Sequence, residues 1–300
     1  MAKNTIVVCG ATGNQGGAVV DALLRSRDFH VVALTRYPDN VSANALYEKG
    51  ADVMFGDLND KASLLAAFKN AHGVFGLTQP WSKDYKKVST KEEMKQGRNI
   101  IEACRESGIR HLVFTSVLSI GMEETGIPHL ESKLMLENNI REGTVPFTIF
   151  KLATFMDNLG APYFPIKDGI IKGSTDGDAK IPYISSKDIG EFVTIAFQFQ
   201  KYYHNIEMNL ITDFVSGNEL AALLSKINDG ESFEYKAEPT FAMKLFAKEF
   251  YKMRLLSEKN GRPPYPPEIE TAIKNCKDKY LNCMTLEQFL IKNGFNKGRF

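Results

Sequence analysis

The stretch from Ile6 to Gly17 constrains the fold of this chain more than any other segment. An apolar run with strand character stops at a Gly10-x-x-Gly13-x-x-Gly16 pattern, and a helix-like segment follows at once. Gly10 lets the backbone turn tightly off the strand, and Gly13 removes the side chain that would block a pyrophosphate. Gly16 or Gly17 lets the helix lie close to the strand, and the N–H groups at the helix start would face the phosphates. Because the glycines stand between a strand and a helix, they predict a dinucleotide site rather than a tight turn alone.

The second predicted strand, residues 30–35, ends at Arg36, twenty residues after Gly16. Sites that bind NAD usually carry Asp or Glu near this position, which accepts a hydrogen bond from the ribose 2′-OH. An arginine instead offers a permanently charged, planar fork to a 2′-phosphate. The following residues, 37–40, place no carboxylate at the strand tip itself. We therefore predict NADP(H) as the cofactor, with a solvated loop charge as the alternative interpretation of Arg36.

Charge and hydropathy argue against several classes of partner. Lys and Arg number 37 against 36 Asp and Glu in 300 residues, so no global field attracts nucleic acid or an anionic membrane. A basic cluster is interrupted by acidic residues, including Glu92 and Glu93, which favours a solvated helix face. Its members are Lys83, Lys86, Lys87, Lys91 and Lys95. No apolar run reaches the roughly 20 residues that span a bilayer, and no signal-peptide pattern precedes the first strand. We expect a cytoplasmic protein, with the nucleus as a further compartment.

The four cysteines fit an intracellular setting. Cys9 falls in the first strand and Cys104 in an amphipathic helix pattern, so both are predicted to be buried thiols. Cys276 and Cys283 stand seven apart without a neighbouring His or Cys to complete a zinc set, and no metal site is predicted. A reversible disulfide between them is the alternative to two reduced thiols.

Strand-like and helix-like segments alternate through the first half of the chain. Further strands are predicted at 52–55, 74–78, 111–115 and 147–152. Helical spacing is found at 44–49, 62–68, 92–107 and 129–141. This alternation predicts an α/β fold with a doubly wound parallel Rossmann sheet, whose ligands bind at the carboxyl ends of the strands.

The second half of the chain changes character. Residues 158–178 are rich in Gly, Pro and aromatic residues and predict a loop-dominated lid with a short hairpin. A strand at 206–211 is expected to rejoin the sheet. Residues 261–267 are predicted to form a rigid, proline-rich loop that acts as a spacer, with a polyproline ligand for a partner as the alternative. Helices are predicted at 185–200, 216–226, 241–256 and 285–292.

Three residues in the middle of the chain are candidates for proton transfer. Ser116 ends the fifth predicted strand, and His129 and Lys133 lie one turn apart on the next helix. Short-chain dehydrogenases use Ser, Tyr and Lys here, and the Tyr, four residues before the Lys, gives a proton to the substrate carbonyl. In this chain His129 stands in place of that Tyr. Its imidazole can transfer a proton, although a helix-start residue after Pro128 is the alternative interpretation. Lys133 can also hydrogen-bond cofactor hydroxyls without catalysis.

Residues at two other strand ends are expected to surround a bound cofactor. Asp57 follows the third strand, where it can accept a hydrogen bond from an adenine amino group or cap the helix that starts near Lys61. Residues 77–79 end the fourth strand and would pass under the nicotinamide-side ribose. Trp81, the only tryptophan, follows on a loop that could close the pocket.

Together these features resemble the NmrA-like proteins, an atypical branch of the short-chain dehydrogenase/reductase superfamily. The resemblance spans nearly the whole chain and is closest to the animal NmrA-like redox-sensor type, which also lacks the catalytic tyrosine. Where close relatives read Tyr-Phe-Glu-Asn, this chain reads Thr-Phe-Met-Asp-Asn at 154–158. The motifs that carry the resemblance are Gly10–Gly17, Arg36, Gly56-Asp57, Lys95-Gln96-Gly97, His129-x-x-x-Lys133, Phe155–Asn158 and Ser185–Gly190.

The resemblance implies an NADP-binding Rossmann domain, residues 1–155 plus 185–212, and a smaller substrate or partner domain, residues 156–184 plus 213–300. It also implies which positions contact NADP(H). These are Gly10, Ala11, Thr12, Gly13, Asn14, Gln15, Gly16, Arg36, Asn40, Asp57, Thr78, Lys95, Lys133, Phe155 and Asn158.

Two functions remain open at the level of the sequence. The missing tyrosine favours a protein that senses NADP(H) and acts on a regulatory protein partner. This hypothesis rests on analogy with the family. The alternative is an NADPH-dependent reductase of quinones or other conjugated carbonyls, because hydride chemistry belongs to the nicotinamide itself. Aromatic residues at 155–165 would suit a flat, quinone-like substrate, although ordinary lid packing also explains them. A homodimer is compatible with either function.

Overall fold

The computed structural model describes residues 3–81, 88–118, 120, 125–246 and 248–297. Lys83, Lys86 and Lys87 of the predicted basic cluster lie outside these ranges. The chain divides into two compact units. The first unit comprises residues 1–117, 128–151 and 186–208, and the second comprises residues 118–127, 152–185 and 209–300.

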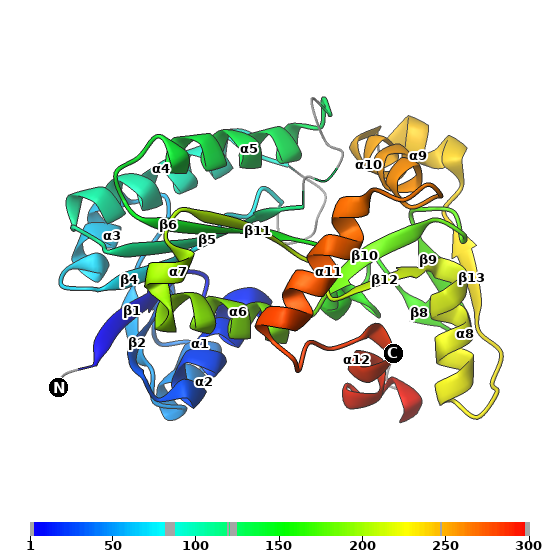
Figure 1. Cartoon of the computed structure of the whole chain (residues 1–300), viewed down its shortest axis with the longest axis horizontal. Coiled ribbons are helices and arrows are strands. Elements are labelled where there is room, and N and C mark those ends of the chain that lie inside the picture. The colour runs from blue at the N-terminus through cyan, green and yellow to red at the C-terminus, as the bar shows by residue number, and fades with distance from the viewer. Residues whose placement is uncertain (1–2, 82–87, 119, 121–124, 247, 298–300) are drawn as a thin grey trace. The chain divides into compact units, whose positions relative to one another are not determined.

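The first unit is built on a seven-stranded sheet (Figure 1). Strand β1 pairs in parallel with β2 and with β4. The pairs β2–β3 and β4–β5 are also parallel. Strand order reverses between β1 and β4, which is the switch point where doubly wound folds bind ligands. In spatial order the strands are β11 (Ile206–Leu210), β6 (Phe147–Leu152), β5 (His111–Val117), β4 (Gly73–Gly76), β1 (Asn4–Val8), β2 (Phe29–Thr35) and β3 (Asp52–Phe55).

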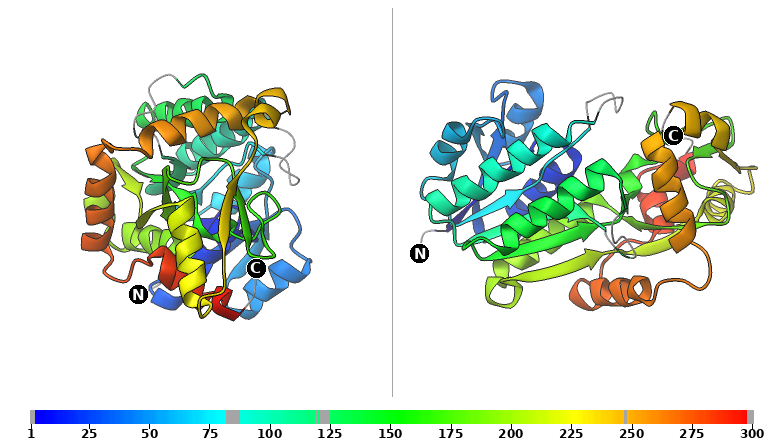
Figure 2. Two further views of the ribbon diagram at one scale, coloured as in Figure 1. Left: turned by 90° about the vertical axis from the view of Figure 1, so that its right-hand side faces the viewer. Right: turned by 90° about the horizontal axis from the view of Figure 1, so that it is seen from above.

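Helices cover both faces of this sheet (Figure 1), as the βα alternation predicts. One face carries α3 (Lys61–Phe68), α4 (Thr90–Glu106) and α5 (Pro128–Arg141), and α4 and α5 run side by side when seen from above (Figure 2). A Cβ on Gly97 would lie 2.3 Å from Leu136 Cδ2, so the glycine of the Lys-Gln-Gly motif permits the close approach of α4 to α5. The remaining helices of the unit are α1 (Asn14–Ser26), α2 (Val41–Glu48), α6 (Ser186–Gln198) and α7 (Gln200–Tyr203).

The second unit contains two three-stranded sheets around a core that includes Tyr183, Leu220 and Leu290. The first sheet consists of β12 (Asp213–Ser216), β10 (Lys180–Ile184) and β7 (Thr154–Phe155). The second consists of β13 (Glu234–Ala237), β9 (Ile170–Gly173) and β8 (Ile166–Lys167). Its helical segments are η1 (Met156–Asn158), α8 (Gly217–Ile227), α9 (Thr240–Phe246), α10 (Lys248–Asn260), α11 (Pro267–Lys279), α12 (Leu286–Lys292) and η2 (Phe295–Lys297).

The predicted fold class is confirmed, including the returning strand at β11 and the hairpin, which the antiparallel strands β8 and β9 form. Helix α11 was not predicted; it starts at Pro267, where the rigid loop was predicted to end. Pro267 at the first turn and Lys277 and Lys279 in the last turn are ordinary helix signals. The proline-rich composition of the preceding loop obscured them.

Cys9 and Cys104 are buried, as the sequence predicts. Cys9 and Cys104 lie in the core of the first unit, and burial raises the pKa of Cys9 to about 12, which keeps the thiol unreactive. Cys276 and Cys283 are both in the thiol form.

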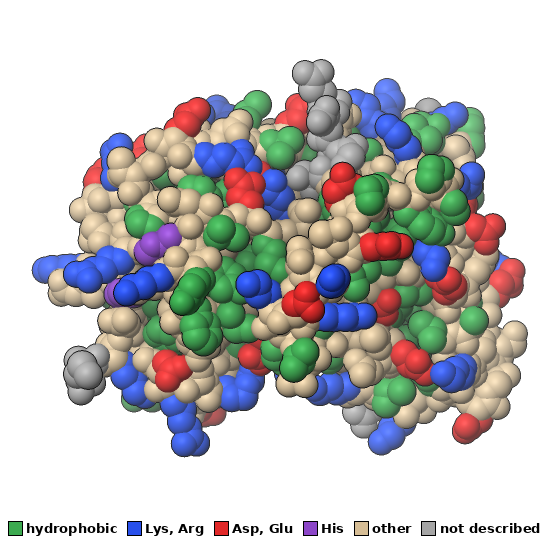
Figure 3. Space-filling view, in the orientation of Figure 1, with side chains coloured by type: hydrophobic (Ala, Val, Ile, Leu, Met, Phe, Trp, Pro, Cys, Tyr) green, Lys and Arg blue, Asp and Glu red, His purple; other side chains and the backbone are tan. Residues whose placement is uncertain are grey.

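The surface charge and the lengths of the helices agree with what the composition predicts. On the face shown in Figure 3, basic and acidic side chains are interspersed. Within the described part of the chain, each helix is too short or too polar to cross a bilayer.

A cluster of histidines lies at the amino-terminal end of β5. The His111 side chain is fully buried, and its Nε2 lies 2.8 Å from the Thr148 hydroxyl. Its Nδ1 has no hydrogen-bond partner among the described residues, and its ring centroid lies 4.9 Å from that of His204. Burial, and then the nearby His204 and His72, lower the pKa of His111 to about 3. The ring therefore stays neutral in the folded protein at pH values where an unfolded chain would protonate it.

This cluster predicts a loss of stability in mild acid. Because the folded pKa lies below the unfolded value, the unfolded state binds the extra proton between about pH 6.5 and pH 3. Stability is complete above that window and falls as the pH drops through it, by up to about 1.4 kcal/mol per pH unit. Urea unfolding from pH 7 to pH 5 measures this slope, which His111→Phe should flatten. An unchanged slope in the variant would show that His111 does not cause it.

Candidate functional site

A cavity of about 840 Å³ opens at the carboxyl ends of the first unit's strands. Six of the residues predicted to contact a cofactor line it: Gly10, Thr12, Gly13, Arg36, Asn40 and Asp57. The other lining residues are Leu34, Thr35, Tyr37, Gly56, Leu58, Leu77, Gln79, Pro80, Trp81, Ser89, Glu92 and Gln96. The volume falls within the range of small-molecule sites.

The glycine motif builds one wall of this cavity. Gly10 has a φ of +62°, which turns the chain away from β1, and its carbonyl accepts a hydrogen bond from the Gly13 N–H at 2.9 Å. A Cβ on Gly16 would lie 2.2 Å from Gly10 O, so only glycine allows this approach of α1 to the loop. Gly13 is the N-cap of α1, and no side chain caps the helix. The first N–H groups of α1 are thus available to an anion.

Arg36 and Asn40 lie on the β2 side of the cavity. The exposed Arg36 guanidinium lies 5.6 Å from the ring centroid of Tyr37 and has no carboxylate partner among the described residues. Asn40 caps α2, since its Oδ1 accepts from the Ala43 N–H at 2.7 Å. An unpaired guanidinium on the wall of a cavity is suited to a phosphate or a carboxylate.

Asp57 also lines the cavity, and the alternative role predicted for it is wrong. The cap of α3 is Asp60, whose carboxylate accepts from the Ala62 N–H at 3.0 Å. Asp57 instead accepts from the Asn59 N–H at 2.9 Å, which fixes the carboxylate in a local turn. The remaining acceptor capacity of this carboxylate is compatible with a ligand amino group or hydroxyl.

His129 packs against Trp81, an aromatic residue of the cavity wall. Trp81 lines the cavity, and its ring lies 5.2 Å from the His129 ring, at an interplanar angle of 57°. His129 is buried in the first turn of α5. Its place beside Trp81 holds the imidazole close to the cavity wall.

Lys133 belongs to a buried polar network rather than to the cavity lining. Its Nζ donates to Thr78 O at 2.6 Å and to Thr78 Oγ1 at 2.8 Å, and it pairs with Glu93 at 2.9 Å. Glu93 is fully buried, so its assignment to a solvated helix face was wrong. It lies on the inner side of α4, where Ser132 and Thr78 also donate to it. Burial lowers the pKa of Lys133, and the charge of Glu93 opposes that shift.

Ser116 is held by a second buried glutamate. Its hydroxyl donates to Glu137 at 2.6 Å, and the same carboxylate pairs with Arg141 at 2.7 Å and with Lys151 at 3.3 Å. Arg141 and Lys151 both also pair with Glu207. Neither Glu137 nor Glu93 was predicted as a buried residue of the site. Their spacing on the buried faces of α4 and α5 was the available signal.

The other predicted contact residues do not line the described cavity. Ala11 and Gly16 are buried beneath the glycine loop, and Gln15 accepts from the Thr115 hydroxyl at 3.0 Å. Lys95 is exposed on α4, whereas its neighbours Glu92 and Gln96 line the cavity. Asn14 begins α1, and Phe155 and Asn158 belong to the second unit. Direct contacts from these residues to a cofactor remain predictions.

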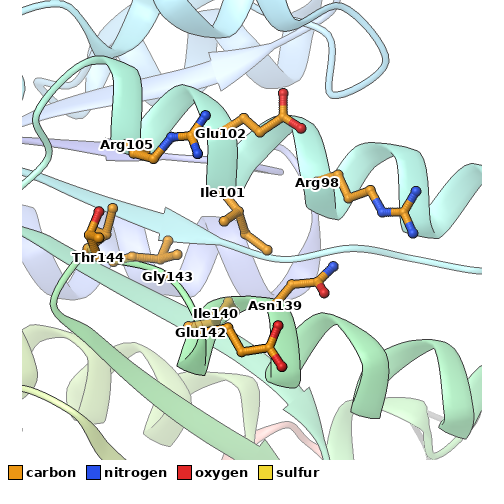
Figure 4. Close-up of a pocket in the computed structure, with 11 residues that line it drawn as sticks. Arg98, Ile101, Glu102, Arg105, Asn139, Ile140, Glu142, Gly143 and Thr144 are labelled. Atoms are coloured by element: carbon orange, nitrogen blue, oxygen red, sulfur yellow. The ribbon is translucent and has the colours of Figure 1, made fainter.

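A smaller cavity, of about 330 Å³, lies at the opposite ends of the strands (Figure 4). Ile101 on α4 and Ile140 on α5 contribute to its apolar part, and Arg98 and Arg105 stand on the α4 side. No predicted site residue lines it. Because ligands of doubly wound sheets bind at the carboxyl ends, the larger cavity is the candidate site.

No cluster of three or more metal-binding side chains occurs among residues that the structure describes.

Sequence comparison establishes the family. The model of the NmrA-like family matches residues 2–290. This chain belongs to the NmrA-like family. It is 31% identical to the NmrA-like family domain-containing oxidoreductase malD of Malbranchea aurantiaca, over 67% of this chain and 66% of malD. The match therefore spans just under two thirds of that protein's length.

Two solved structures share the NmrA-like fold. NmrA, a negative transcriptional regulator crystallised with NADP, has a TM-score of 0.75 at 19% identity, covering 96% of this chain and 94% of NmrA. The triphenylmethane reductase of Citrobacter sp., complexed with NADP(H), has a TM-score of 0.74 at 19% identity. That match covers 97% of this chain and 99% of the reductase. The same fold thus serves both a regulator and a reductase.

Proposed function

We propose that this chain binds NADP(H) in the larger cavity and acts as an NADP(H)-responsive regulator. The observation that carries the proposal is a combination of two features on the walls of one cavity. No side chain caps the start of α1, and the Arg36 guanidinium has no carboxylate partner within the part of the chain that the structure describes. The α1 N–H groups would hold the pyrophosphate, and Arg36 would hold the 2′-phosphate that distinguishes NADP(H) from NAD(H).

The residues present fit this cofactor. A Cβ on Gly16 would press on the carbonyl of Gly10, so the loop stays flat against the helix start only with glycine there. Asp57 contributes acceptors on the β3 side. Both solved relatives named above were crystallised with this class of cofactor, which supports the assignment.

The contacts of Ser116 and Lys133, which stand where short-chain dehydrogenases have two catalytic residues, favour a regulatory function. The hydroxyl of Ser116 is bonded to Glu137, and the ammonium of Lys133 is bonded to Thr78 and Glu93. Neither group is directed into the described cavity, and the catalytic tyrosine is replaced by His129. A regulator also requires that a protein partner distinguish the bound from the free state. The cytoplasmic location and the homodimer stay predictions.

A reductase is the second candidate, and the name of malD supports it. Bound NADPH would supply hydride, so the chain's own residues would only need to orient a quinone-like or conjugated acceptor and exclude water. Anaerobic NADPH consumption by the full chain, with a panel of quinones and enones, separates the two functions. Saturable binding without turnover supports the regulator, whereas saturable turnover would replace it with the reductase.

Arg36→Ala should weaken NADPH binding and leave NADH binding nearly unchanged. A charge-assisted hydrogen bond to a phosphate contributes about 1.5–3 kcal/mol, which corresponds to a loss of roughly 10- to 100-fold in NADPH affinity. Quenching of Trp81 emission during titration with each nucleotide measures both affinities. Arg110→Ala, which removes another exposed arginine of the same unit outside the cavity, is the matched control. Equal losses for both nucleotides would contradict the assignment of Arg36 to the 2′-phosphate.

A further inference from the structure

Three oxygen atoms hold the ammonium group of Lys133. It donates to Thr78 O and Thr78 Oγ1 at 2.6 and 2.8 Å, and it forms an ion pair with Glu93 Oε1 at 2.9 Å. While these contacts persist, the ammonium is engaged within the buried network rather than with a ribose hydroxyl or a substrate.

The Glu93 carboxylate is the acceptor of the same network. Glu93 Oε1 accepts from the Thr78 hydroxyl at 2.9 Å, and Oε2 accepts from the Ser132 hydroxyl at 2.5 Å. Glu93 has no exposed surface, so Lys133 balances its charge while the two hydroxyls supply hydrogen bonds. Removing one partner of such a buried pair is strongly destabilising, because it leaves the other charge uncompensated.

The carbonyl that Lys133 holds belongs to the cavity wall. Thr78 stands between Leu77 and Gln79, which both line the cavity, and Pro80 and Trp81 continue the same wall. A second anchor lies further along, where the Ser89 N–H donates to Pro80 O at 2.8 Å. Residues 77–80 of the wall belong to no helix or strand, and Trp81 forms an isolated bridge with Val88.

We propose that Glu93 fixes Lys133 as a positioning residue, which holds the Thr78 carbonyl and thereby sets the cavity wall from Leu77 to Trp81 for cofactor binding. This inference rests on the proposed NADP(H) function. Lys133 acts on the cofactor through the wall, and Glu93 acts through Lys133. The charged groups that face Lys133 are Glu93 on α4 and Glu137 on its own helix, both acidic, and both favour its charged form.

The only tryptophan of the chain gives a direct readout of this wall. Acrylamide quenching of Trp81 emission, measured without nucleotide, reports how firmly the wall is held. An NADPH titration then measures the affinity of the cavity for the cofactor. The variants are Glu93→Gln, Lys133→Met and the double variant. The control is Lys61→Met, because Lys61 also pairs with two glutamates of α4, Glu102 and Glu106, but lies outside the cavity.

Glu93→Gln and Lys133→Met should each increase acrylamide quenching and weaken NADPH binding about tenfold, equivalent to roughly 1.4 kcal/mol. The double variant should be no worse than the worse single variant, because both changes remove one shared network. Lys61→Met should match the wild type. If Lys133→Met fails to fold, Thr78→Val, which removes only the hydroxyl, should shift quenching and affinity in the same direction.

Direct contact between Lys133 and the cofactor would give a different pattern. Lys133→Met would then weaken NADPH binding while Glu93→Gln left both quenching and affinity as in the wild type, which would overturn the inference. For any acceptor that is reduced, a positioning role predicts a higher KM for NADPH in Lys133→Met with an unchanged pH profile of kcat. Loss of kcat at unchanged KM would overturn it. Absence of NADPH binding in the wild type would refute the proposed function, whereas unchanged quenching in the variants would refute the network separately.

Discussion

Gly16→Ala should abolish tight NADPH binding and destabilise the first unit. The new Cβ would lie 2.2 Å from Gly10 O, 2.5 Å from Gly10 C and 2.8 Å from Ala11 N, and all three are backbone atoms that no side-chain rotation can move. The glycine loop would have to shift away from the start of α1, where the N–H groups meet the phosphates. We expect a loss of about 1–3 kcal/mol or more in unfolding free energy. The affinity for NADPH should fall at least roughly tenfold.

Gly17→Ala is the matched control for this prediction. Its Cβ would lie 3.4 Å from Ala11 O, which is an ordinary contact, and the residue stands inside α1. Alanine is favoured over glycine in a helix by about 1 kcal/mol, so the control should be as stable as the wild type or more stable. Urea unfolding and NADPH titration of both variants provide the comparison. Similar behaviour of the two variants would mean that the close approach at Gly16 does not shape the site.

Glu137→Ala should destabilise the protein by about 3 kcal/mol, the lower end of the cost of breaking a buried ion pair. The carboxylate is fully buried and receives Ser116, Arg141 and Lys151. Its removal leaves Ser116 without this acceptor, and Glu207 remains as a carboxylate partner of both cations. The retained contacts to Glu207 are the reason for expecting the lower end of the range.

Equilibrium urea unfolding measures the effect of Glu137→Ala, and Glu142→Ala serves as its control. Glu142 lies just beyond the end of α5 and is exposed, so its replacement should change stability by no more than about 0.5 kcal/mol. A loss below about 1 kcal/mol for Glu137→Ala would indicate that the network is not a stabilising element of the first unit.

The first unit was largely predictable because local signals and tertiary structure agree there. Strands β3 and β6 have the predicted bounds, and the glycine motif stands at the predicted junction of β1 and α1. The second unit was less predictable. Its strands are only two to five residues long, too short to show a period, and α11 follows a proline-rich loop that predicts irregular structure.

The residues of the candidate site that follow strand ends were predicted from the sequence. The buried residues behind the cavity wall were not. The glycine loop, Arg36 and Asp57 follow strand ends, so topology places them in one cavity. Glu93 and Glu137 have the spacing of buried positions on α4 and α5, but the sequence does not show the cations that pair with them. Such a partner is what makes a buried carboxylate tolerable. Ser116 bonds to Glu137 across 21 residues of sequence, and Lys133 on α5 pairs with Glu93 on α4. Both contacts join different elements, so no local pattern records them.

Equilibrium titration of the full chain with NADPH and with NADH, side by side, tests the central claim most directly. The account predicts saturable binding of NADPH with one site per chain, at least about tenfold tighter than NADH because only NADPH offers a 2′-phosphate to Arg36. Equal affinity for the two nucleotides would contradict the role of Arg36, and absence of saturable binding by either would contradict the assignment of the cavity itself.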